Sequence, residues 1–353
     1  MEDEKIIGFE ALWDSMMKCK RGVMWKDSVA HFVLNSVSEV AKLSNELTNG
    51  TYRERAHKYF TIRYPKERTI MSISFRDRVY QRSLNDVAIY PLMSRSFIYD
   101  NCACQKGKGS DFARERMKCH MQRYYRKHGT DGYVLKIDIR KYYDSMRHDV
   151  VKDVFRKHLP GNVYERAARI LDGFPGDVGF NPGSQIIQIA GISMLNDLDH
   201  YIKERLCVKH YMRYMDDMVL IGESRNQLQE WLYQIEKQLA KIGFEVHPEK
   251  TKVATLRDGM MWLGYHYRLT DNGKVVMTAD PDRLKSTRRK YARLAQRCRQ
   301  GKISRKKVDE SYLCWRECAS KGDGRRMLRR MNAYYTGLWR DTRYESSKTS
   351  GAT

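Results

Sequence analysis

The feature that most constrains the fold is a pair of adjacent aspartates, Asp216 and Asp217, between two short apolar runs. Residues 208–214 and 218–221 are both typical of β-strands, so the segment is predicted to be two strands joined by a tight turn. Carboxylates a few ångströms apart repel each other, and a cation removes that cost. An Asp-Asp pair also makes a good turn, and the pair alone does not decide between a metal site and a turn.

A third aspartate ends another predicted strand. Residues 133–137 form a short apolar run that stops at Asp138. If the strands are neighbours in one sheet, three carboxylates meet at one edge and provide the oxygen ligands that hard divalent cations prefer. The sequence therefore predicts a site for two Mg²⁺ ions, with Mn²⁺ as an alternative.

The overall charge favours a polyanionic partner. The chain has 66 Lys and Arg against 43 Asp and Glu, a formal net charge of +23, and basic side chains release counterions from a phosphate backbone. Residues 283–307 contain twelve Lys or Arg and no acid, with an apolar stripe at helical spacing, which predicts a basic helix. A solvated charged face is the alternative for this helix.

The sequence gives no sign of a membrane or secretory protein. It lacks a run of about 18 apolar residues, and its acidic N-terminus does not resemble a signal peptide. Eight scattered cysteines are interpreted as reduced thiols, so we expect a cytoplasmic protein without membrane contact.

Periodicity predicts a mixed α+β fold. Helical spacing is expected in residues 8–48, 75–93, 148–172, 188–204 and 224–242. Strand-like alternation is expected in residues 58–73, 244–246 and 260–267.

Several blocks of the chain resemble a known family. Tyr214-Met215-Asp216-Asp217 resembles the YxDD signature of reverse transcriptases, and residues 135–144 (LKIDIRKYYD) resemble their preceding catalytic strand and turn. The further blocks that resemble bacterial and phage enzymes of this family, in order, are residues 64–70 with 75–78, 104–109, 182–188 with 195–200, 247–252 and 262–265.

The resemblance implies a right-hand polymerase fold with fingers, a palm with an antiparallel sheet, and a helical thumb. It places an N-terminal extension and fingers at residues 1–130, and a palm at 131–270 with a finger–palm insertion around 150–200. A basic thumb follows at 271–345, and a disordered tail at 346–353. The implied activity is RNA-directed DNA synthesis by a two-metal mechanism. The implied partners are a dedicated noncoding template RNA, its cDNA and RNA–DNA hybrid, and dNTPs.

The resemblance also implies roles for individual residues. Asp138 and Asp216 bind both metals with support from Asp217, and Lys250 donates a proton to the leaving pyrophosphate or only pairs with Glu249. Tyr143 is a steric gate that excludes a 2′-hydroxyl, unless it simply packs. The remaining implied contacts are, with the dNTP, Lys66, Arg68, Pro182, Gly183 and Gln188, and with nucleic acid, Lys106, Lys108, Trp262, Gly264, Tyr265, Arg288, Arg289 and Arg293.

One block departs from the family pattern and leaves the biological role open. Residues 182–188 read PGSQIIQ, where diversity-generating retroelements typically read [ILV]GxxxSQ and retroviral and intron enzymes QGxxxSP. The shared Gly183 and Gln188 imply a diversity-generating retroelement with a small basic accessory protein. An anti-phage defence enzyme that makes a specific cDNA and a non-catalytic RNA-binding scaffold remain alternatives. Tyr143 argues against an RNA-templated RNA polymerase.

Overall fold

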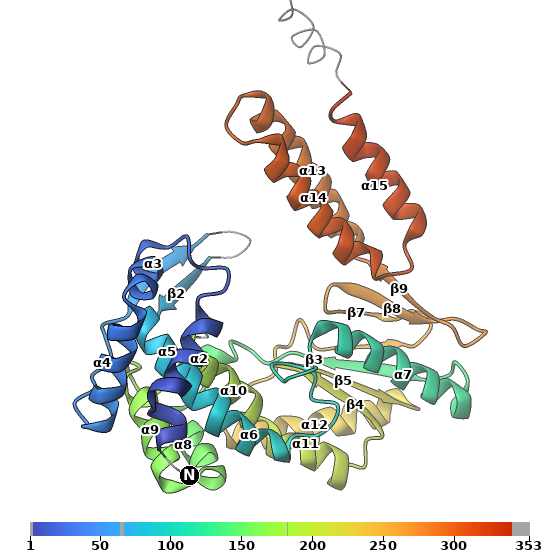
Figure 1. Cartoon of the computed structure of the whole chain (residues 1–353). Coiled ribbons are helices and arrows are strands. Elements are labelled where there is room, and N and C mark those ends of the chain that lie inside the picture. Colours follow the sequence, from blue (N-terminus) through green and yellow to red (C-terminus); the bar gives the residue numbers. More distant parts are fainter. Residues whose placement is uncertain (1–2, 64–66, 182, 341–353) are drawn as a thin grey trace, which may run out of the picture. The chain divides into compact units, whose positions relative to one another are not determined.

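The computed structural model describes residues 3–63, 67–181 and 183–340. Helices and antiparallel β-hairpins alternate along the chain, so the predicted mixed α+β fold is confirmed (Figure 1). The chain divides into two compact units. The first comprises Met1–Met117 and Leu135–Lys252, and the second Lys118–Val134 and Val253–Thr353.

The N-terminal part of the first unit is a cluster of helices around α5 (Phe75–Leu84). Helices α1, α2 and α3 all pack against α5, whose N-terminus is capped by Ser74. One helical segment was predicted in residues 8–48, and the structure divides it into several helices. The helices before the central sheet, including two short irregular ones, are α1 (Glu4–Ile7), α2 (Phe9–Cys19), α3 (Asp27–Leu34), α4 (Ser36–Thr48), α5 (Phe75–Leu84), η1 (Asn85–Ile89), α6 (Tyr90–Met93), η2 (Ser94–Ser96) and α7 (Ser110–His128).

The predicted strand pair in residues 58–73 is present. Strands β1 (Lys58–Ile62) and β2 (Arg68–Ser72) are antiparallel, with Phe60 opposite Ile70. All five residues of β1 are exposed, so this hairpin has no buried face on that strand.

A four-stranded sheet has the order β4-β5-β3-β6; β4, β5 and most of β3 belong to the first unit, and all of β6 except its first residue belongs to the second. The chain passes between the two units within α7, within β3 and again at the start of β6. Strand β5 is almost completely buried, which explains its continuous apolar sequence, and α12 packs against it. The bounds of the strands are β3 (Tyr133–Ile137), β4 (His210–Tyr214), β5 (Asp217–Gly222) and β6 (Lys252–Thr255).

Helical segments connect the strands of this sheet along the chain. The predicted amphipathic helix at 224–242 is α12 (Arg225–Lys241), and Ser224 caps it by accepting from the backbone of Gln227. Residues 244–246 form no strand; Val246 makes only an isolated bridge with Ile139. The other helical elements are η3 (Tyr143–Ser145), α8 (His148–His158), α9 (Gly161–Asp172), α10 (Gln185–Met194), α11 (Asn196–His200) and η4 (Tyr201–Arg205).

The second unit combines an antiparallel sheet with a bundle of three helices. The predicted basic helix at 283–307 ends earlier, at Arg299, and the basic run continues into a second helix. The rings of Tyr312 and Tyr335 stack in the bundle core with centroids 3.7 Å apart. The elements are β7 (Met260–Trp262), β8 (Tyr265–Leu269), β9 (Val275–Ala279), α13 (Pro281–Arg299), α14 (Arg305–Ser320) and α15 (Arg325–Gly337).

Candidate functional site

The adjacent aspartates lie at the tip of the hairpin that β4 and β5 form. Tyr214 pairs with Asp217 across the two strands, so Met215 and Asp216 form a two-residue turn. Met215 has a φ of 56°, a left-handed conformation that costs a residue with a side chain about 1–3 kcal/mol. The surrounding structure must therefore hold this turn in place.

A buried ion pair provides that support. Arg213 and Asp199 are both fully buried, and Arg213 Nε and Nη2 donate to the two Asp199 carboxylate oxygens at 2.8 and 2.5 Å. Arg213 Nη1 donates to the carbonyl oxygen of Met215 at 2.8 Å. The Tyr211 hydroxyl donates to Asp199 Oδ1 at 2.6 Å. The guanidinium thus connects the strained turn directly to α11.

Asp138 directly follows β3, the strand next to β5. Its carbonyl oxygen accepts from His247 N at 2.7 Å, and its Oδ1 accepts from Lys250 Nζ at 2.8 Å. The residue is 8% exposed, whereas the Lys250 side chain is half exposed. The position of Asp138 is thus fixed by the segment that carries Lys250.

The electrostatics show that the three carboxylates interact. Burial, together with the negative charges of Asp217 and Asp138, raises the pKa of Asp216 to about 6. Burial also raises the pKa of Asp217, although the Lys136 ammonium, 3.3 Å from Asp217 Oδ1, opposes the shift. Two lysines therefore compensate part of the negative charge.

The donor set fits divalent cations. Across residues 3–63, 67–181 and 183–340, no three Asp, Glu, His or Cys side chains are already arranged to hold a metal ion. Ammonium groups contact Asp138 and Asp217 instead. Three close carboxylates with incompletely compensated charge nevertheless supply the hard oxygen ligands that such ions prefer.

Tyr143 is positioned beside the aspartates. Burial raises the pKa of its hydroxyl, and negative charge on Cys104 and on Asp216 acts in the same direction. Gln188 lies on α10, one turn before Gly191, and Gly191 contacts the Tyr143 ring. The structure thus brings Tyr143 and the helix of Gln188 to the aspartate site.

Other predicted dNTP contacts are described only in part. Lys66 and Pro182 lie outside the described residues, as does the side chain of Arg68. A Cβ atom on Gly183 would be 2.6 Å from the carbonyl oxygen of Met71. Only glycine therefore fits against β2 at this position.

The two predicted nucleic-acid lysines of the first unit differ in their surroundings. Lys108 Nζ donates to the carbonyls of Tyr99 and Asn101 at 2.8 and 3.0 Å, and burial lowers its pKa. Lys106 is exposed, with its Nζ 5.3 Å from the centre of the Tyr90 ring. Lys108 therefore holds its own loop together, and contact with nucleic acid stays a prediction for both lysines.

In the second unit, the segment from Trp262 to Tyr265 is a tight turn between β7 and β8. Trp262 and Tyr265 are 1% and 7% exposed, so both rings belong to the core. Gly264 has a φ of 86°, and a Cβ atom there would be 2.7 Å from Arg283 Nη1. Leu263 and Gly264 between the two buried rings are partly exposed, and contact of this turn with nucleic acid stays a prediction.

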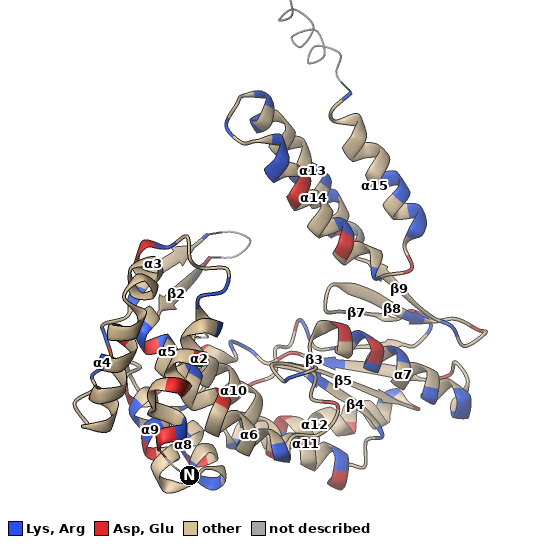
Figure 2. Ribbon diagram, viewed as in Figure 1, with Lys and Arg blue, Asp and Glu red and all other residues tan. Residues whose placement is uncertain are grey.

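The predicted arginines of α13 are not equivalent. Arg289 and Arg293 are exposed and one turn apart, so they share a face. The Arg288 guanidinium lies over the Tyr334 ring, 5.4 Å from its centre, within the bundle. In Figure 2, blue ribbon marks Lys and Arg residues on α13 and at the start of α15.

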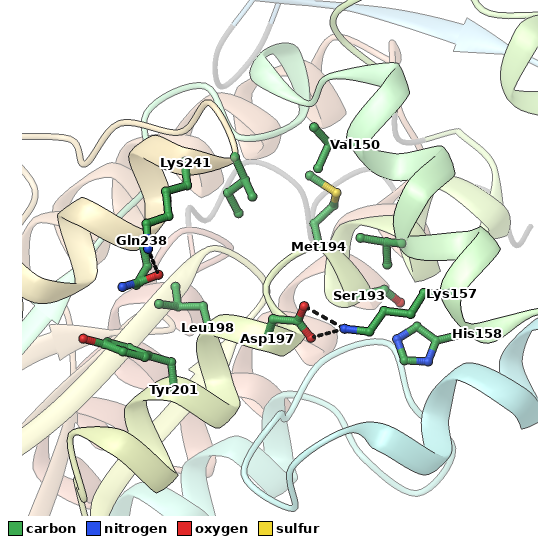
Figure 3. A pocket seen from close by; sticks show the side chains of 12 residues that line it. Val150, Lys157, His158, Ser193, Met194, Asp197, Leu198, Tyr201, Gln238 and Lys241 are labelled. Carbon is green, nitrogen blue, oxygen red and sulfur yellow. Dashed lines mark hydrogen bonds and ion pairs between the residues drawn. The ribbon is translucent and has the colours of Figure 1, made fainter.

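A cavity of about 150 Å³ lies elsewhere in the first unit (Figure 3). Lys157 of α8 and Asp197 of α11 form an ion pair of 3.0 Å at its wall. Among the described residues, none of the predicted site residues lines this cavity. It therefore adds nothing to the aspartate site.

The sequence interpretation missed three charged residues near the turn: Lys136, Asp199 and Arg213. Lys136 and Arg213 interrupt the apolar segments 135–137 and 211–220, and Asp199 directly follows the largely apolar segment 186–198. A charged residue within a buried segment needs a partner, and this signal would have identified them.

Comparison with known proteins identifies a family. Residues 64–267, more than half of the 353 residues, match the model of the family described as reverse transcriptase (RNA-dependent DNA polymerase). No curated protein matches the chain.

No helix within the described ranges is both long enough and apolar enough to span a membrane.

Solved telomerases are among the similar structures. One from Candida albicans, in complex with a fragment of telomeric RNA, is 14% identical with a TM-score of 0.49, over 80% of this chain and 54% of that chain. An apo telomerase from Candida tropicalis, truncated from its C-terminal domain, is 14% identical with a TM-score of 0.46, over 71% of this chain and 60% of that chain. The chain thus spans little more than half the length of these proteins.

Proposed function

The chain belongs to the reverse transcriptase (RNA-dependent DNA polymerase) family, and we propose on this premise that it is an enzyme that synthesises cDNA on a dedicated noncoding template RNA. The membership confirms the predicted right-hand polymerase fold, and catalysis in this family depends on divalent metal ions. We keep residues 1–130 as N-terminal extension and fingers, 131–270 as palm and 271–345 as thumb. The predicted tail at 346–353 lies outside the described residues.

The observation that supports this function best is the interaction of three carboxylates at the ends of neighbouring strands, those of the buried Asp138 and of the half-buried Asp216 and Asp217. When bound, two Mg²⁺ ions, or Mn²⁺ instead, supply an activated primer 3′-hydroxyl and neutralise the leaving pyrophosphate. Asp138 and Asp216 would hold both ions and Asp217 would support them. Lys250, half exposed and paired with Asp138, would give a proton to the leaving pyrophosphate.

The incoming dNTP would contact residues on several elements. Tyr143 would lie beneath the sugar and exclude a 2′-hydroxyl, while Gly183, just before α10, and Gln188, on α10, would line the nucleotide site. Lys66 and Arg68 hold the triphosphate, because basic side chains suit phosphate oxygens. Template and primer would contact the remaining predicted residues: Lys106, Lys108, Trp262, Gly264, Tyr265, Arg288, Arg289 and Arg293.

The biological setting favoured by Gly183 and Gln188 is a diversity-generating retroelement with a small basic accessory protein, and anti-phage defence is the second candidate. The test is to purify the protein after expression from its native locus and to sequence all bound RNA and DNA. One dominant noncoding RNA with matching cDNA supports the proposal, and scattered errors at template adenines support the diversifying role. A uniform cDNA made during phage infection supports defence. RNA without complementary DNA supports the non-catalytic scaffold.

Tyr143→Val is expected to increase rNTP incorporation relative to dNTP by about 10–100-fold, the size of a steric discrimination in a pocket. The ratio of the two kcat/KM values measures this effect. Tyr233→Val, which removes a half-exposed ring on α12, serves as the control. An unchanged ratio for the Tyr143 variant would show that this ring is not the steric gate.

Replacing both Arg289 and Arg293 with Ser is expected to weaken binding to an RNA–DNA duplex and to reduce its salt dependence. Each lost phosphate contact reduces the magnitude of the negative slope of log K against log salt by about 0.7–0.9, so the loss of two contacts reduces it by about 1–2. The control is the double variant Arg147→Ser, Arg156→Ser, which removes the same charge at exposed sites paired with acids. Equal slopes for the two double variants would contradict a specific duplex contact on α13.

A further inference from the structure

Gly191 is a buried glycine inside α10 (Gln185–Met194), an otherwise strongly apolar helix. Glycine in a helix interior is less favourable than alanine by about 1 kcal/mol. The helix itself therefore gives no reason for glycine at this position, and the reason must lie in what packs against it.

Two tyrosines from the loop after β3 contact this glycine. A Cβ atom on Gly191 would be 3.0 Å from the Tyr143 hydroxyl oxygen, and 3.2 and 3.3 Å from Cε1 and Cζ of the same ring. These distances are shorter than ordinary van der Waals contacts. A methyl group at Gly191 would therefore push the Tyr143 ring away from α10 by a few tenths of an ångström.

The neighbouring tyrosine fixes the helix against the same loop. Gly191 lies in the last turn of α10, where carbonyl groups lack partners within the helix. Its carbonyl oxygen accepts a hydrogen bond from the Tyr142 hydroxyl. The rings of Tyr142 and Tyr143 also pack edge to face, with centroids 5.5 Å apart. Gly191 and the two rings are thus packed together, so α10 cannot shift without moving both tyrosines.

We propose that Gly191 is a specificity-determining residue, because it gives the Tyr143 ring the space to lie against α10 and so sets the width left for the nucleotide sugar. The proposal rests on the proposed function of Tyr143 as the steric gate. Asp216 acts electrostatically on the Tyr143 hydroxyl. Displacement of this ring from α10 changes the width of the nucleotide site, because Tyr143 lines that site in the proposed function.

Gly191→Ala is expected to raise the KM for dNTP about tenfold, because displacements well below 1 Å are costly at a reacting centre. Binding of the RNA template should not change. The variant should fold, since alanine favours the helix. Gly161→Ala in α9 is the matched control, because a Cβ atom there meets no atom within 4 Å, and its KM should equal that of the wild type.

A double-mutant cycle distinguishes this role from general packing. In a Tyr143→Val background, Gly191→Ala should leave the KM for dNTP unchanged. Added to Gly191→Ala, Tyr143→Phe, which removes the closest atom, should reverse part of the rise in KM. An equal rise in KM with and without the Tyr143 ring, or no rise at all, would overturn the proposal.

Failure of the gate itself has a different signature. If Tyr143→Val leaves the selection of dNTP over rNTP unchanged, the proposed function of Tyr143 is wrong whatever Gly191→Ala does. If Tyr143→Val abolishes that selection and Gly191→Ala behaves as Gly161→Ala does, only the inference about Gly191 fails.

Discussion

Replacing Asp216 with Asn is expected to abolish DNA synthesis and, in metal-free buffer, to stabilise the fold. Asn keeps the shape of the side chain but supplies a weaker, neutral ligand for a divalent cation. We expect a loss in kcat of at least about 10³-fold, equivalent to about 4 kcal/mol of transition-state stabilisation.

The effect on stability follows from the raised pKa of Asp216, about 6 in the folded protein against an ordinary 3.8. A carboxyl group with a raised pKa holds its proton more tightly in the folded state, so folding loses stability as the pH rises between these values. Above pH 6 the folded state bears the full free-energy cost of the ionised Asp216 carboxylate, and a neutral Asn removes this cost. The free energy of unfolding at pH 7.5 should therefore increase.

Primer extension on an RNA template and urea denaturation with a chelator measure the two effects. Asp153→Asn is the control, because Asp153 is exposed on α8 and pairs only at the surface with Arg156. It should change neither quantity. A variant that loses both activity and stability would indicate misfolding, and the assignment of Asp216 would then lack support.

Asp199→Asn should destabilise the protein by about 3–5 kcal/mol, because it leaves the buried Arg213 guanidinium without its counter-charge. The same change should lower kcat, since Arg213 then holds the Met215 carbonyl less firmly. Template binding should be affected less than kcat, because the pair contacts the turn and not the surface.

The chain offers a matched control for this prediction on the same helix. Asp197 on α11 is exposed and pairs with Lys157, and an exposed pair contributes only about 0–1 kcal/mol. Urea unfolding of Asp197→Asn should therefore resemble that of the wild type. If the Asp199 and Asp197 variants unfold at the same urea concentration, the buried pair does not hold the hairpin.

Local patterns were sufficient to predict the hairpin of Asp216 and Asp217. The apolar runs on either side of the turn and the strand before Asp138 have the periodicity of strands, and the structure forms all three. The helical spacing of residues 224–242 likewise predicted α12, which Ser224 caps in the structure. In these segments, local sequence preference and burial favour the same structure.

The other parts of the fold and of the site could not be predicted from local patterns, because they depend on tertiary contacts. Residues 244–246 have a strand-like sequence but form only a bridge at Val246. The basic run after Arg283 was predicted as one helix because its basic residues continue without interruption. In the structure, a loop that ends at the Ser304 cap separates α13 from α14. The burial of Trp262 and the short distance between Gly191 and Tyr143 depend on contacts between residues that are distant in the sequence. Sequence periodicity carries no information about such contacts.

The most direct test of the account is to extend a DNA primer on an RNA template of defined, non-repetitive sequence with purified wild-type protein, dNTPs and Mg²⁺, and to sequence the product. The account predicts DNA complementary to the template, absent when Mg²⁺ is chelated and absent with Asp216→Asn. DNA of template-independent sequence, or equal synthesis by Asp216→Asn, would contradict RNA-directed synthesis at these aspartates.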